Sequence, residues 1–223
     1  LFWGGVSNGV QQLLGMLFGI YLARTLNAED YGLVGMLAIF SGIASTIINS
    51  GFSVALTNKL DATHKDYNAV FWFSFVVSIC LYIVLFFSAP LIASFYDRQE
   101  LVNLSRVIFA SFLFSGMAIV PHVILFKQLQ VKMQAKIDVF ALFLSGMCGV
   151  LLAFNGFAYW ALAIQSTVYV ASASLLKWMV VSWRPSLDFS IEPLKEMFPF
   201  SVKLFLTNIF QQVNNNVFSV LLG

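Results

Sequence analysis

The stretch VFWFSFVVSICLYIVLFFSAPLIASFY, residues 70–96, contains no charged side chain and is long enough to cross the hydrocarbon core of a bilayer as a helix. Further apolar stretches lie on both sides of it, at residues 2–23, 31–56, 106–126, 139–154, 158–181 and 199–222. Hydrophobic residues make up 60% of the chain and charged residues only 10%, which excludes an ordinary soluble domain. Because backbone polar groups in lipid must be paired within their own segment, the sequence predicts an all-α, polytopic transmembrane helix bundle.

Positive charges are distributed unequally between the loops. If successive loops alternate sides, nine of the twelve Lys and Arg residues fall on one side, and three, Arg24, Arg98 and Arg106, fall on the other. The positive-inside rule then predicts a multi-pass protein of the cytoplasmic membrane whose N-terminus faces the cytoplasm. Since these charges lie in separate loops rather than in one stripe, we expect no nucleic-acid partner.

Two of the predicted cytoplasmic segments, residues 126–138 and 187–198, have an amphipathic pattern. In the first, Leu129, Met133 and Ile137 recur at intervals of four residues. We interpret both segments as helical ends that lie in the headgroup layer with membrane lipids as partners, and capture of a substrate is the alternative.

A short motif recurs near the two ends of the chain. SNGVQQ at residues 7–12 is echoed by TNIFQQ at residues 207–212, and such amides are costly in lipid. The echo predicts two similar six-helix halves, although a chance match is the alternative. The chain then divides into a six-helix transmembrane lobe at 1–181, a cytoplasmic amphipathic linker at 182–198 and the first helix of an incomplete second lobe at 199–223. On this interpretation the functional protein is roughly twice as long as the chain.

Polar side chains share one face of the first and of the last predicted span. The face contains Asn8, Gln11 and Gln12 in the first span and Asn208, Gln211, Gln212 and Asn215 in the last. Two such faces favour a hydrated, substrate-binding cavity between two lobes, and hydrogen bonding between packed helices is the alternative. Asn49 is a further candidate for the same lining, although an irregular helix at Gly51 explains the local pattern equally well.

Charged and titratable side chains are scarce within the spans. Arg24, at the outer end of the first span, has a planar fork that suits a phosphate or pyrophosphate, and snorkelling or pairing with Glu29 and Asp30 is the alternative. His122 follows a proline at a predicted kink, where a packed neutral imidazole is more common than a proton relay. Asp138 lies near a predicted helix end within reach of water, so the sequence shows no carrier for ion coupling.

Signatures of catalysis are absent from the sequence. It contains no Gly-rich phosphate loop, no zinc-spaced His and Cys set and no Ser-His-Asp pattern. The loops are also too short for the external catalytic loops that membrane glycan polymerases and ligases usually carry. We therefore expect no catalytic residue, no metal site and no cofactor, and a protein that is not an enzyme.

Four motifs carry a family resemblance. LARTLNAEDYGLVG at residues 22–35 resembles the first inter-helix turn of the Wzx-type lipid-linked oligosaccharide flippases, bacterial polysaccharide exporters of the multidrug/oligosaccharidyl-lipid/polysaccharide exporter superfamily. AVFW at 69–72, APLIA at 89–93 and GFAYWAL at 156–162 resemble the same family. The similarity extends along the whole chain, but it rests on hydrophobic and turn-like motifs.

The resemblance implies a two-lobed transporter that works by alternating access in the bacterial inner membrane. It implies a flippase for undecaprenyl-pyrophosphate-linked oligosaccharide or polysaccharide repeat units, moved from the cytoplasmic to the outer leaflet for O-antigen, capsule or exopolysaccharide synthesis. A glycan polymerase and the export machinery are the implied partners. Asn8, Gln11, Gln12, Arg24 and the matching polar face of the last span are implied to bind substrate. One alternative is a multidrug or cation antiporter of the same superfamily, which needs a carboxylate inside a lobe. A second is a membrane-embedded glycan polymerase or ligase. A third is a non-transporting bundle, such as an assembly partner, which the paired polar faces disfavour.

Overall fold

The computed structural model describes residues 2–49, 51–188 and 190–222, and in this part of the chain the regular structure is helical. The helices are α1 (Phe2–Thr25), α2 (Ala28–Asn49), α3 (Phe52–Asn58), α4 (His64–Phe95), α5 (Leu101–Lys127), α6 (Val131–Phe154), α7 (Tyr159–Val180) and α8 (Glu192–Leu222). The prediction of an all-α helix bundle is confirmed.

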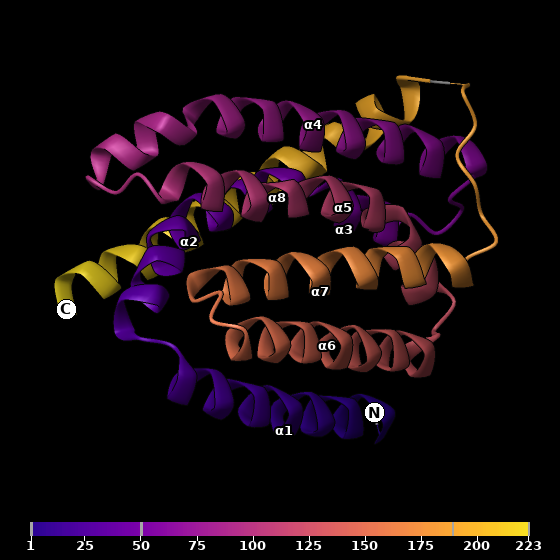
Figure 1. The fold of residues 1–223 in the computed structure, drawn as a ribbon. Coiled ribbons are helices and arrows are strands. Elements are labelled where there is room, and N and C mark those ends of the chain that lie inside the picture. The colour runs from indigo at the N-terminus through magenta and orange to yellow at the C-terminus, as the bar shows by residue number, and fades with distance from the viewer. Residues whose placement is uncertain (1, 50, 189, 223) are drawn as a thin grey trace.

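The long helices stack in a fixed order (Figure 1). α1 packs against α6, α6 against α7, α7 against α5 and α5 against α4, while α2 contacts α4, α5, α7 and α8. α5 lies between α4 and α7 and also contacts α2 and α3, and it buries Leu104, Phe109 and Leu125 completely. The core of the bundle therefore lies around α5.

Small residues bring α4 and α5 close together. A Cβ atom on Gly116 of α5 would lie only 2.4 Å from Ser78 Oγ of α4. Close approach of this kind provides the van der Waals contact that replaces the hydrophobic effect between helices in lipid.

Within the described residues, four helical segments are long and apolar enough to cross a membrane. They are Ala28–Asn58, which combines α2 and α3, and the helices α4, α5 and α6. The chain is thus a multi-pass membrane protein. That α1, α7 and α8 also cross the membrane stays a prediction.

Several boundaries differ from the predicted ones, and two of the differences affect how α8 is placed. The second span is interrupted at Gly51, which has a left-handed φ of 77° and precedes α3. A Cβ atom at Gly51 would lie 2.5 Å from the carbonyl oxygen of Ser201 in α8, so glycine is needed both for the turn and for this contact. α8 already begins at Glu192, so residues 192–198 of the predicted linker are continuous with the last predicted span despite Pro199.

The connection between α7 and α8, residues 181–191, is attached to the start of α4 (Figure 1). Asn68 is only 1% exposed; its Nδ2–H donates to the carbonyl of Asp188, and its Oδ1 accepts the backbone N–H of Ser186 at 3.0 Å. Trp72 donates its indole N–H to the carbonyl of Ser186 at 2.8 Å. A buried amide with both ends bonded holds this α7–α8 connection against α4.

A charged cluster secures the same end of the bundle. Lys59 Nζ lies 2.9 Å from Asp66 Oδ1 in α4 and 2.6 Å from Glu196 Oε2 in α8. These hydrogen bonds, first to Glu196 and then to Asp66, raise the pKa of Lys59. The carboxylate of Asp66 also accepts the backbone N–H and the hydroxyl of Thr63 in a capping box that starts α4.

Candidate functional site

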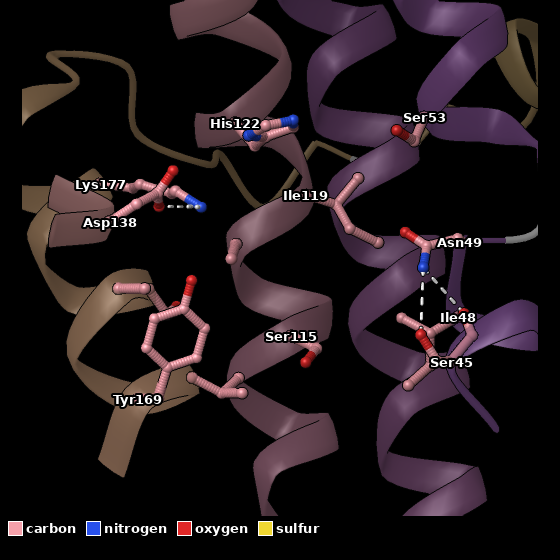
Figure 2. A pocket seen from close by; sticks show the side chains of 14 residues that line it. Ser45, Ile48, Asn49, Ser53, Ser115, Ile119, His122, Asp138, Tyr169 and Lys177 are labelled. Atoms are coloured by element: carbon pink, nitrogen blue, oxygen red, sulfur yellow. Dashed lines mark hydrogen bonds and ion pairs between the residues drawn. The ribbon is translucent and has the colours of Figure 1, made fainter. Parts of the chain in front are cut away.

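A polar cavity of about 280 Å³ lies among α2, α3, α5, α6 and α7 (Figure 2). Ile48 and Ile119 form apolar parts of its wall. Its polar lining consists of Ser45, Asn49, Ser53, Ser115, His122, Asp138, Tyr169, Ser174 and Lys177. The cavity therefore combines hydroxyls, an amide and ionisable groups within a bundle of mostly apolar helices.

A proline interrupts the part of α5 that lines this cavity. Pro121 has no backbone N–H, so the carbonyl of Met117 lacks its usual helical donor. Trp178 of α7 supplies one instead, since its indole Nε1–H donates to Met117 O at 3.0 Å. This bond fixes α7 against α5 next to His122, which lines the cavity.

The charged pair of the cavity comes from α6 and α7. Lys177 Nζ lies 3.9 Å from Asp138 Oδ1, and their side chains are 14% and 32% exposed. The distance is too long for a direct hydrogen bond. Each of the two groups can therefore bond to a ligand in the cavity without first breaking a hydrogen bond to the other. Figure 2 shows this pair and Tyr169 on one side of the α5 residues, with Ser45, Asn49 and Ser53 on the other.

The wall of the cavity that contains the Asn49 amide is held by hydrogen bonds within α2 itself. Asn49 donates its Nδ2–H to the carbonyl of Ser45 at 2.9 Å, and Ser45 Oγ lies 3.4 Å away. The broken backbone at Gly51 then turns Ser53 of α3 into the same cavity. Together the two walls offer donors and acceptors suited to a ligand with several hydroxyls and a negative charge. Among the described residues, no three His, Cys, Asp or Glu side chains are grouped as a metal site requires.

The predicted polar face of α1 lies away from this cavity. Asn8 and Gln12 are exposed, and Gln11 is half-buried with its Nε2–H donated to Ser7 Oγ at 2.9 Å. α1 packs against α6, whereas α8 packs against α2, α3 and α4, so the two helices have different neighbours. Of the predicted site residues, Asn49 lines the cavity. A role for the α1 face in binding stays a prediction.

Arg24 is exposed at the end of α1, and the acids proposed as its partners are engaged elsewhere. Glu29 pairs with Arg98 at 2.6 Å, and Asp30 accepts the backbone N–H of Asn27 at 3.0 Å. In α8, Asn208 is half-buried, and the side chains of Gln211, Gln212 and Asn215 lie outside the described residues.

Sequence reasoning missed the ionisable part of the cavity. Asp138 was expected near a helix end because the span was predicted to begin at residue 139, but α6 begins at Val131 and places Asp138 two turns inside it. The expectation that this half has no carrier for ion coupling stays a prediction, although Asp138, Lys177 and His122 line one cavity. The amphipathic pattern of residues 126–138 was the available signal.

A family of known proteins matches most of the chain. The family model described as "Polysaccharide biosynthesis protein" matches residues 21–223. The chain belongs to this polysaccharide biosynthesis family. The resemblance carried by residues 22–35 is thereby confirmed.

Curated relatives of this family member are bacterial proteins, and two of them show how far the similarity extends. The chain is 28% identical over 182 residues to the teichuronic acid biosynthesis protein TuaB of Bacillus subtilis, covering 81% of the chain and 38% of the relative. It is 19% identical over 232 residues to the lipopolysaccharide biosynthesis protein WzxC of Escherichia coli, covering 99% of the chain and 45% of the relative. The chain thus spans less than half the length of these relatives.

Solved structures show the same fold. A MOP superfamily transporter from Pyrococcus furiosus matches with a TM-score of 0.67 and 19% identity, covering 97% of the chain and 52% of the transporter. A MATE structure matches with a TM-score of 0.61 and 22% identity, covering 93% and 52%. The polysaccharide biosynthesis family member therefore has the helix arrangement found in about half of an exporter of this superfamily.

Proposed function

We propose that the protein containing this chain is a flippase. It moves undecaprenyl-pyrophosphate-linked oligosaccharide or polysaccharide repeat units from the cytoplasmic to the outer leaflet by alternating access. The observation that carries the proposal is a polar, charged cavity inside a bundle that has the fold of MOP superfamily transporters. Membership in a polysaccharide biosynthesis family supports a glycan substrate.

The cavity residues have distinct roles in this proposal. Lys177 binds an anionic group of the substrate, exchanging its long contact with Asp138 for it. Asn49, Ser45 and Tyr169 contact sugar hydroxyls and the sugar ring. Arg24 and the polar face of α1 contribute on the side of the second lobe.

The location and orientation belong to the same proposal. The protein lies in the bacterial inner membrane with a cytoplasmic N-terminus, and its partners are a glycan polymerase and the export machinery. Single cysteines at Lys136 and Glu100 test the orientation, because the two exposed positions lie on opposite predicted sides. Labelling of Lys136→Cys by an impermeant maleimide in intact cells, with Glu100→Cys protected, contradicts it.

Leaflet accessibility of the lipid-linked oligosaccharide tests the flippase proposal directly. Cells that lack the complete gene are complemented with the wild-type gene or an Arg24→Ala variant. We expect unpolymerised units to accumulate on the cytoplasmic leaflet without the gene and to reach the outer leaflet with it. Normal arrival at the outer leaflet without the gene refutes the proposal.

A multidrug or cation antiporter is the second candidate, because Asp138 supplies the carboxylate inside a lobe that such a protein needs. Its pairing with Lys177 argues for an anionic rather than a cationic ligand. Export of cationic drugs by the full-length protein, with normal glycan flipping in its absence, favours this candidate.

A further inference from the structure

Two apolar compartments flank Phe73 on the outer surface of α4. The first, about 460 Å³, is lined by Trp72, Phe73, Val76, Val77 and Leu187. The second, about 250 Å³, is lined by Phe52, Phe73, Ile191, Leu194, Lys195 and Phe198. Together, the two compartments form the Phe73 groove.

The α7–α8 connection builds one wall of the Phe73 groove. Leu187 lies between Ser186 and Asp188, whose backbones are bonded to buried Asn68. Trp72 also bonds the carbonyl of Ser186, which leaves the apolar ring of its indole to line the groove. Leu187 is thereby held at 89% exposure, an arrangement that costs free energy in water but not against a lipid chain.

The surroundings of the groove are those of a membrane surface. α4 is one of the helices long and apolar enough to span a membrane, and Val76 and Phe198 are more than half exposed. Lys195 brings a positive charge to the second compartment. Apolar compartments with a cation at the edge match a lipid that has an anionic headgroup.

We propose that the Phe73 groove binds an anionic phospholipid. One acyl chain occupies each compartment, and the headgroup phosphate lies at Lys195. Two compartments separated by one side chain fit a lipid with two chains better than a single polyprenyl chain. The site is distinct from the polar cavity, and its occupancy is independent of transport.

Native mass spectrometry of the full-length protein in detergent tests this site, with dioleoyl phosphatidylglycerol and dioleoyl phosphatidylethanolamine as probes. We expect retention of phosphatidylglycerol in preference to phosphatidylethanolamine. Val77→Trp fills the first compartment and lowers retention by about tenfold, because each excluded methylene weakens association. Leu91→Trp, at an exposed site farther along α4, is the matched control and leaves retention unchanged.

Charge reversal tests the headgroup contact. Lys195→Glu abolishes the preference for phosphatidylglycerol, while Lys136→Glu, an exposed lysine on α6, preserves it. Equal losses of phospholipid retention in Val77→Trp and Leu91→Trp overturn the proposal. Wild-type protein that retains neither phospholipid overturns it as well. Displacement of both probes by a polyprenyl phosphate reassigns the groove to the single-chain lipid and overturns it too.

Discussion

Trp178 donates its indole N–H to the carbonyl of Met117 at 3.0 Å, and this is the carbonyl that Pro121 leaves without a helical donor. The tryptophan thus repairs the defect that the proline creates, and it does so from the neighbouring helix. Because the bond joins α7 to α5 beside His122, it links the geometry of the cavity to the pairing of these two helices.

Replacement of the donor should expose this defect. Trp178→Phe keeps an aromatic ring but leaves Met117 O unpaired, so we expect a loss of about 1–3 kcal/mol in the free energy of unfolding in detergent. In a Pro121→Ala background the backbone N–H of residue 121 can bond Met117 O, so the same substitution should cost less. Equal costs in the two backgrounds contradict this account.

The charged pair should matter for transport more than for folding. Asp138→Asn and Lys177→Gln each leave one charge in the cavity, and we expect outer-leaflet delivery of the glycan to fall by about tenfold or more. The double variant removes the unpaired charge and should recover thermal stability but not delivery. Recovery of delivery would show that the pair is only structural. Lys136→Gln, exposed on α6, serves as the control.

The glycine between α2 and α3 should tolerate no side chain. Gly51→Ala forces a left-handed φ of 77° on alanine and brings a Cβ atom to 2.5 Å from Ser201 O. We expect a loss of about 1–3 kcal/mol in stability, measured by thermal unfolding in detergent. Gly35→Ala in α2, where no atom beyond the adjacent backbone of α2 lies within 4 Å of the new Cβ, should be neutral or stabilising. Similar effects of both substitutions would refute the contact with α8.

The buried amide of Asn68 should control the α7–α8 connection. Asn68→Ala removes the acceptor of the Ser186 N–H, so we expect that amide to exchange hydrogen with solvent faster in the full-length protein. Asn103→Ala, at an exposed position of α5, is the comparison and should leave the exchange unchanged. If the Ser186 amide is still protected from hydrogen exchange in Asn68→Ala, other contacts hold the α7–α8 connection against α4.

The sequence by itself determined the helices and their order, because apolar length and turn residues act locally. Residues 70–96 had to be a helix in lipid, and α4 (His64–Phe95) contains most of them. An irregular helix at Gly51 was one of two explanations that the sequence left open, and the structure has both the break and Asn49 in the cavity lining. The motifs at residues 22–35 and 156–162 indicated the family from local sequence as well.

Only the tertiary structure decided which polar groups meet. Asp138 and Lys177 lie on different helices, and α6·α7 packing brings them into one cavity with His122 of α5. The pattern of α1 shows that one face is polar, but that α1 packs against α6 while Asn8 and Gln12 stay exposed depends on helix packing. Hydropathy and periodicity report which face of a helix is polar; which other helix it meets is set by contacts between residues distant in sequence.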